Sequence, residues 1–244
     1  MRTLAATLLL AAAFSARADA LADVKRALAT LRGTSAISAT YEARQTNKAH
    51  GRFFNENFNA HSAADVSGGE GGVTVTLSRA TVERLRAQRA AGRRRGENNS
   101  AEEAGDVPAG RVAELLDFAP TLQAMLARAV PLGERDAALG GTPARLLTLK
   151  IPPERSPSKD VTIDSKGDDL SLWIGRDGVP LAAERKAQYS VGFLFLKATG
   201  GASEKWTFMR RDDRLVVVRH ERIASGGGLG ETSEGTQTES VAPR

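Results

Sequence analysis

The chain has no cysteine among its 244 residues. Disulfide bonds, thiolate metal sites and a cysteine nucleophile are therefore excluded, and the fold must be stabilised by its core alone. Aromatic residues make up only 5% of the sequence, and there are three histidines. His50, His61 and His220 lack the close paired spacing of a zinc site, and none lies near a nucleophile motif. The sequence thus predicts no metal site, no cofactor and no catalytic residue.

Long hydrophobic runs are also missing. Residues 4–14 are apolar but too short to span a bilayer, Arg2 precedes them, and Ala18 and Ala20 are the small residues of a cleavage site. We interpret residues 1–20 as a cleavable signal peptide; the alternative is a buried first helix. No later segment reaches the roughly 20 consecutive apolar residues of a membrane span, and no cysteine is available for lipid attachment. The sequence predicts a periplasmic protein released from the membrane.

Residues 21–244 have a length that suits one domain, with a helical and loop insertion at about residues 80–131. Apolar residues recur at helical spacing over residues 21–31, and Gly33 follows as an expected C-terminal cap. Residues 37–43 alternate between apolar and polar side chains, as in a strand with one buried face. Residues 52–58 are its expected hairpin partner, and a short strand is predicted at residues 73–77.

The insertion is predicted to be helical at both ends. Residues 81–95 favour a surface helix with few apolar positions, and residues 96–110 are polar and glycine-rich, as in a loop. Residues 112–130 carry the strongest helical stripe of the chain. Pro120 lies inside this stripe and should kink or divide it, because proline removes a backbone donor and clashes with the preceding turn.

From residue 147 onward, short alternating runs separated by turn residues predict an antiparallel meander. Turns are expected at residues 164–169, 175–178, 200–201 and 212–213, and a last strand at residues 232–241. Residues 191–196 direct phenylalanines to one face and leucines to the other, so both faces need cover. We therefore predict an α+β fold. Its curved antiparallel β-sheet, a half-barrel, wraps over the inserted helical segment, and an amphipathic helix begins the domain.

Such curvature leaves room for an apolar cavity between the sheet and the helix. Aromatic residues on the predicted strands are the candidates to line this cavity, although aromatic side chains on strands more often belong to an ordinary core. The candidates are Trp173, Phe193, Phe195, Trp206 and Phe208.

Residues 170–180 read LSLWIGRDGVP, a strand, an Asp-Gly turn and a proline restart. With the signal peptide, first helix, helical insertion and meander, this segment resembles the periplasmic lipoprotein-carrier family of LolA- and LolB-like half-barrels. The resemblance implies a hydrophobic cavity for the acyl chains of lipoproteins or other lipids, and a protein partner in the inner or outer membrane. Without an acylated cysteine, the chain is more similar to the soluble carrier than to the anchored acceptor. The same fold also serves sensor domains.

The whole chain has a formal net charge of +5, and its arginines are concentrated in one segment. Seven arginines fall within residues 79–95, and Arg93, Arg94 and Arg95 are consecutive. They are candidates to bind lipid headgroups or an acidic partner; the competing interpretation is a solvated helix face. Nucleic acid is not expected, because no recognised binding motif accompanies the charge. Three hypotheses remain: a carrier or binder of acyl chains, a protein-binding or sensor module that uses the basic helix and, least favoured, an enzyme.

Overall fold

A computed structural model describes residues 19–52, 54–90, 103–104, 107–152, 161–193, 196–228 and 230–244. The described helices are α2 (Ala20–Ala29), α3 (Arg79–Ala90), α4 (Ala109–Leu116) and α5 (Ala119–Arg128). The described strands are β1 (Ile37–Gly51), β2 (Phe54–Gly69), β3 (Gly72–Thr76), β4 (Glu103–Ala104), β5 (Val130–Leu139), β6 (Thr142–Lys150), β7 (Val161–Ile174), β8 (Pro180–Phe193), β9 (Leu196–Arg211), β10 (Arg214–Gly228) and β11 (Glu231–Pro243).

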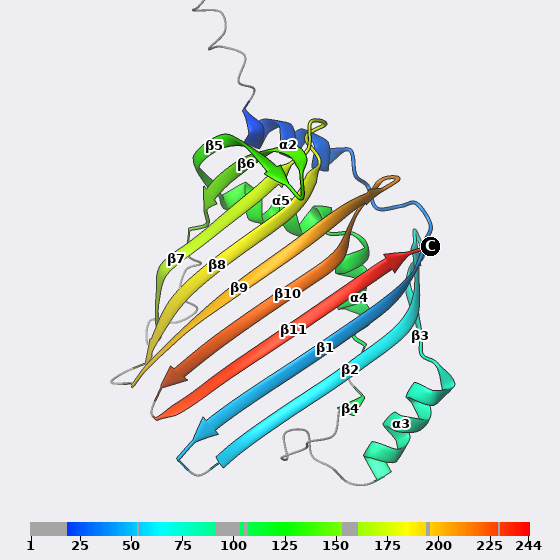
Figure 1. Ribbon diagram of the computed structural model, residues 1–244, viewed down its shortest axis with the longest axis vertical. Coiled ribbons are helices and arrows are strands. Elements are labelled where there is room, and N and C mark those ends of the chain that lie inside the picture. Colours follow the sequence, from blue (N-terminus) through cyan, green and yellow to red (C-terminus); the bar gives the residue numbers. More distant parts are fainter. Residues whose placement is uncertain are drawn as a thin grey trace, which may run out of the picture.

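All of these strands belong to one curved sheet, and α4 and α5 lie against one of its faces (Figure 1). Ten strands follow the order β3-β2-β1-β11-β10-β9-β8-β7-β6-β5, with antiparallel neighbours, and β4 pairs in parallel with β2. The end strands β3 and β5 are not paired with each other, so the sheet is not closed into a barrel. This arrangement confirms the predicted curved antiparallel sheet over an inserted helical segment.

The first helix, α2, is fixed by a cap and by its apolar stripe. The side chain of Asp19 accepts hydrogen bonds from the backbone N–H groups of Leu21 and Ala22, and Val24 and Leu28 are fully buried. The predicted cleavage point after Ala20 falls at the first residue of this helix. Gly33 was predicted to cap it, but α2 already ends at Ala29. Gly33 instead lies in the following loop with a φ of 68°, a conformation that favours glycine.

The predicted long helix of residues 112–130 is divided into α4 and α5. The chain breaks at Asp117 and Phe118, and Pro120 lies in the first turn of α5, where a missing N–H costs no helical hydrogen bond. The N–H of Phe118 donates to the carbonyl of Leu215 on β10 at 2.8 Å. The division predicted from Pro120 is therefore confirmed, and it lets the break bond directly to the sheet.

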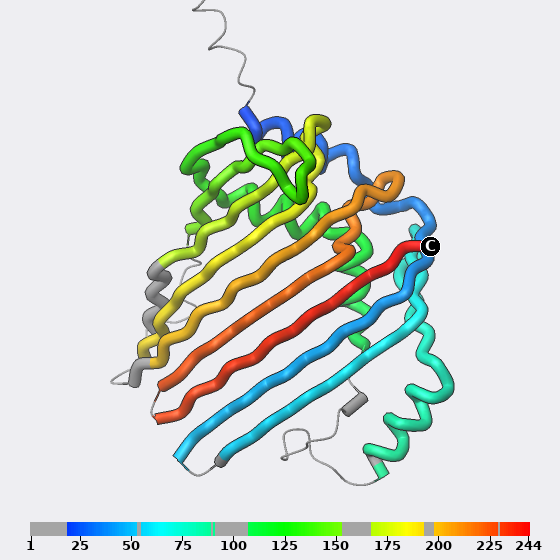
Figure 2. The backbone as a smooth tube through the Cα atoms, viewed as in Figure 1, coloured from blue at the N-terminus to red at the C-terminus, as the bar shows by residue number. Residues whose placement is uncertain are grey.

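Two local predictions were wrong, and one strand was missed. Gly200 and Gly201 do not form a turn but lie inside β9, hydrogen-bonded to strands on both sides. Residues 164–169 continue β7 rather than turning. Strand β5 was not predicted, since its side chains are almost all exposed and show no alternation. Figure 2 shows the long central strands running without interruption from the helix-covered end to the hairpins.

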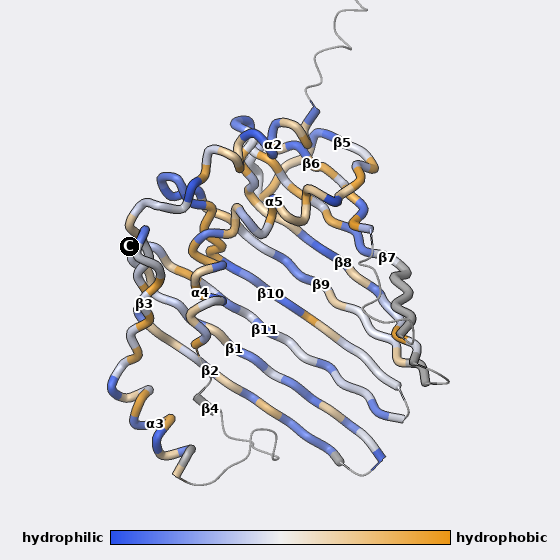
Figure 3. Tube along the Cα trace, turned by 180° about the vertical axis from the view of Figure 1, so that it is seen from behind, coloured by the Kyte–Doolittle hydropathy of each residue, from blue (hydrophilic) through white to orange (hydrophobic). Residues whose placement is uncertain are grey.

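The core lies between the sheet and the helices. Along β7, Leu170, Leu172 and Ile174 alternate with more exposed residues and are fully buried. From the other side α4 and α5 contribute apolar residues that are also fully buried, among them Leu115 and Leu126. Seen from behind, the hydrophobic segments gather where the helices meet the sheet (Figure 3). Apolar burial therefore holds one end of the sheet face against the helices.

Candidate functional site

Two of the five aromatic candidates lie in the filled core. Trp206 and Phe208 on β9 are buried, and both rings pack on Phe118, with centroids 5.7 and 5.5 Å away respectively. Phe118 is the residue between α4 and α5. Aromatic side chains thus occupy part of the space between sheet and helices where the sequence predicts a cavity.

Trp173 lies on the opposite face of the sheet. It alternates along β7 with Leu172 and Ile174, which belong to the core, whereas its own side chain is only half-buried. Its register partners on the neighbouring strands are Leu146 and Ala182. The fold therefore separates Trp173 from the other aromatic candidates whose side chains are described.

The remaining candidates fall where no side chain is described. Phe193 is the last residue of β8, but its side chain is outside the described part of the structure. Phe195 and Arg93, Arg94 and Arg95 lie outside the described residues altogether. Their proposed roles stay predictions.

A group of polar side chains lies beside the core, where α4 meets the sheet. Arg111 of α4 binds Glu239 of β11 through two nitrogens, at 2.6 and 3.0 Å, and Glu114 of its own helix at 2.7 Å. Tyr41 of β1 donates to the other oxygen of Glu239 at 3.0 Å. The Nδ1 atom of His220 on β10 lies 2.9 Å from Glu239 and 2.8 Å from Arg111. These five residues, which we call the polar cluster, join α4 to three adjacent strands.

The protonation of His220 decides which neighbour its Nδ1 binds. A neutral ring with its proton on Nε2 accepts a hydrogen bond from Arg111, whereas the protonated ring donates to Glu239. Nε2 lies 3.9 Å from a carboxylate oxygen of Glu204, and the ring stacks on Trp206 with centroids 5.4 Å apart. Nδ1 therefore has a partner in both protonation states.

The ionisable groups of the polar cluster have shifted pKa values. Burial by itself raises the pKa of Glu239, but hydrogen bonds from His220 and Arg111 and the charge of Arg111 lower it to about 2. Burial by itself lowers the pKa of His220, and the carboxylates of Glu204 and Glu239 more than offset this, so that pKa is raised. Burial and the neighbouring Glu239 raise the pKa of Tyr41. At neutral pH Glu239 is therefore ionised and Tyr41 carries its proton.

The polar cluster was not among the predicted site residues. Its partners are distant in sequence, since the residue numbers of Tyr41 and Glu239 differ by 198 and those of Arg111 and His220 by 109. One signal was available, because Glu239 stands in the same alternating phase as the buried Val241, and a buried carboxylate needs a partner. Glu239 and His220 are only 1% and 3% exposed, so the cluster serves to fasten α4 to the sheet.

Toward the hairpins, the helix side of the sheet is lined by small residues. The strand register aligns Ala187, Ala202, Ala224 and Gly235 across β8 to β11, and Gly200, Gly226 and Ser233 in the next row. Both rows share the face of Trp206 and His220, because side chains on a strand alternate between faces. All seven are half-buried or exposed. We call them the small-residue floor: Ala187, Ala202, Ala224, Gly235, Gly200, Gly226 and Ser233.

Tyr189 forms one side of this floor. It faces Gly200 directly across the β8 and β9 pairing, and a Cβ atom added at Gly200 would lie 2.8 Å from its ring. The glycine is therefore needed for the tyrosine to lie flat across the neighbouring strand. The side chain of Tyr189 remains 42% exposed, which makes it an accessible aromatic surface at the end of the floor.

Neither a metal site nor a membrane span emerges from the described residues. No three His, Asp or Glu side chains in this part of the chain come together as a metal-binding group. None of its helices combines the length and the hydrophobicity that crossing a membrane requires.

Comparisons with known proteins give structural matches only. No family model matches the sequence, and no curated protein matches it. Among solved structures, the crystal structure of MucB in complex with MucA(peri) is similar over 91% of this chain and 94% of that chain, with 11% identity and a TM-score of 0.22. A TM-score this low supports no inference about function, which must come from the side chains of this chain itself.

Proposed function

We propose that this chain is a non-catalytic periplasmic binding protein that holds an acyl chain of a lipid or lipoprotein on the small-residue floor. The observation that carries this proposal is that the helices cover only one end of this sheet face. Helices α4 and α5 bury the strands at one end, while the floor stays partly exposed beside the core. Alanine methyl groups and bare glycine backbone leave a shallow apolar surface, where each buried methylene gains about 0.8 kcal/mol.

A charged row separates the floor from the core and suits an amphipathic ligand. Arg185 binds Asp168 through two hydrogen bonds of 2.8 and 2.7 Å. The Nε atom of Arg222 lies 3.5 Å from a carboxylate oxygen of Glu204. Ion pairs at this boundary keep water and polar groups nearby. A headgroup or lipoprotein peptide would remain hydrated at this row, while the acyl chain extends over the floor toward the hairpins.

The sequence features of residues 1–20 support the compartment. A basic start, a short apolar stretch and small residues at a cleavage site are typical of an exported protein. Acyl chains of lipoproteins are exposed to water during transit between two membranes. A periplasmic protein that binds them would shield them from water.

Filling the floor tests the proposal. The double variant Ala202→Phe and Ala224→Phe covers the floor, whereas Ser203→Phe with Ile223→Phe adds the same rings one position away, on the opposite face. Titration with monomeric dodecyl lysophosphatidylcholine should give an affinity at least about tenfold lower for the first variant. The opposite-face variant should bind as the native chain does. Equal effects of both variants, or no binding by the native chain, would exclude the floor as the acyl site.

A second candidate function, binding of an acidic protein partner, rests on α3. This helix projects beside the β3 end of the sheet (Figure 1). Arg79 pairs with Glu83 at 2.8 Å, while Arg84 and Arg86 are exposed. Charge reversal at Arg84 and Arg86 should then abolish capture of the partner and leave lysophosphatidylcholine binding unchanged. If the reversed protein captures the same partner, the basic helix is not the binding surface.

A further inference from the structure

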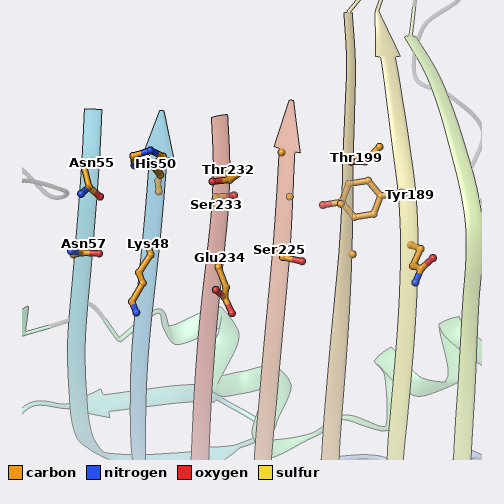
Figure 4. Close-up of a pocket in the computed structure, with 16 residues that line it drawn as sticks. Lys48, His50, Asn55, Asn57, Tyr189, Thr199, Ser225, Thr232, Ser233 and Glu234 are labelled. Carbon is orange, nitrogen blue, oxygen red and sulfur yellow. The ribbon is translucent and has the colours of Figure 1, made fainter. Parts of the chain in front are cut away.

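A groove lined mostly by polar residues crosses the face of the sheet that is turned away from α4 and α5. It has a volume of about 840 Å³ and runs over β2, β1, β11, β10, β9 and β8 near their hairpin ends. Figure 4 views this groove with the helices behind the strands. The volume lies within the range of pockets that hold small organic ligands, about 300–1,000 Å³.

Two rows of side chains form the walls of the groove. Asn57, Lys48, Glu234 and Ser225 stand opposite one another on four neighbouring strands. The second row, one side-chain repeat closer to the hairpins, contains Asn55, His50, Thr232 and Thr199. Figure 4 shows Asn55, His50 and Thr232 side by side on their strands. This groove was not predicted from the sequence, because its residues come from six separate strands.

The bottom of the groove is backbone. Ala49, Gly226 and Gly200 lie between the two rows and turn their Cβ positions to the helix side. Gly201 and Gly227 interrupt the walls, and neither adds a side chain. A ligand can therefore approach the strands closely, which is one reason for glycine inside a strand.

The lining chemistry selects the class of ligand. Side chains with an amide or a hydroxyl group outnumber the charged ones in the lining, and each can donate and accept a hydrogen bond. Lys48 and Glu234 face each other on adjacent strands, so the groove has no excess of one charge for a polyanion. An acyl chain would leave these polar groups without partners, which is unfavourable. A neutral ligand with many hydroxyl groups satisfies them.

We infer that this groove binds a neutral oligosaccharide. Several sugar rings lie across the strands, and their hydroxyl groups pair with Asn55, Asn57 and the lining hydroxyl groups. The groove and the small-residue floor lie on opposite faces of the sheet and have Gly200, Gly226 and Ser233 in common. Asn55 and Asn57, whose side chains would pair with the sugar, are not part of the floor. One chain then recognises a polar glycan on one face and an apolar chain on the other.

The test is a calorimetric titration of the full chain with maltohexaose and with chitohexaose. At least one of these neutral sugars should bind, and Asn55→Ala with Asn57→Ala should weaken its binding about tenfold or more through the lost hydrogen bonds. Asn59→Ala is the matched control, since Asn59 lies on the same strand and face but outside the groove. Its dissociation constant should stay within about twofold of the native value.

A groove-filling variant gives a second readout. A Cβ atom at Gly201 would meet its nearest neighbours at 3.4 and 3.8 Å, so Gly201→Thr fits the strand and obstructs the groove. It should abolish sugar binding and leave lysophosphatidylcholine binding unchanged. The inference is overturned if neither sugar binds at millimolar concentration, if the asparagine variant binds as well as the native chain, or if anionic hexagalacturonate binds in preference to both neutral sugars.

Discussion

The two ends of the helix-side sheet face differ in both cover and composition. Near α4 and α5, the strands carry large side chains such as Leu149, Leu170 and Leu172, which are fully buried. Near the hairpins, the same set of strands carries alanine, glycine and serine that remain partly exposed. The polar cluster lies at the boundary between these ends and satisfies its buried charges internally. One continuous sheet thus joins a stabilising core to an accessible surface.

This difference shows how the fold can keep an uncovered surface without a loss of order. The long strands are held by hydrogen bonds along their whole length, while apolar burial is concentrated at the covered end. The exposed end contributes little to the core, so core packing does not restrict which side chains it carries, and these side chains can serve binding. Substitutions at the two ends should therefore differ sharply in their effect on stability.

The largest expected effect is on the covered end. Phe118→Ala removes the ring on which Trp206 and Phe208 pack, and should lower the free energy of unfolding by about 3–5 kcal/mol. Tyr189→Ala removes an aromatic ring from the exposed end and should cost less than about 1 kcal/mol. Urea denaturation followed by circular dichroism measures both. Similar losses would show that the two ends do not differ as described.

The boundary should show the next largest effect. Glu239→Gln removes the negative charge that Arg111 and His220 bind, and should cost about 2–4 kcal/mol, since among the described residues Arg111 then keeps Glu114 alone as a counter-charge. Glu234→Gln makes the same change on the same strand in the exposed end, and should alter stability by less than about 0.5 kcal/mol. An equally mild effect at Glu239 would contradict the role of the polar cluster.

The pH dependence of stability gives a smaller effect. His220 has a raised pKa in the folded chain, so its contribution is complete below the unfolded pKa of about 6.5 and is lost as the pH rises through the folded pKa. Burial and the charge of Arg111 lower the pKa of His220, and Glu204 and Glu239 more than offset both. The native chain should therefore lose stability across this interval, and His220→Gln should lose less. If the free energy of unfolding changed with pH in the same way in both proteins, His220 would not be the source of the pH dependence.

Alternation and helical spacing predicted much of the fold because they report burial. The strand of residues 37–43 and the meander follow from side chains that alternate between core and solvent, whereas the division at Pro120 follows from the missing N–H of proline. Strand β5 could not be found in this way, since both of its faces are largely exposed. Gly200 and Gly201 were mistaken for a turn. A glycine pair looks the same in a sequence whether it forms a turn or leaves part of a strand without side chains.

The candidate sites depended on register, which the sequence does not show. Ala187, Ala202 and Ala224 become neighbours only once β8, β9 and β10 are aligned. The bulge between Val217 and Arg219 also shifts the phase of β10, so alternation from the buried Val217 does not lead to the buried His220. Local pattern predicts which elements form, whereas the sites arise from pairing between distant strands.

A single labelled cysteine on the floor tests the central claim most directly. Because the chain has no cysteine, Ala202→Cys and Ser203→Cys each introduce one thiol for an environment-sensitive dye, on opposite faces of β9. Addition of monomeric dodecyl lysophosphatidylcholine should shift the emission of the dye at residue 202 to the blue and leave residue 203 unchanged. A shift at residue 203 alone, or at neither residue, would contradict an acyl-binding floor.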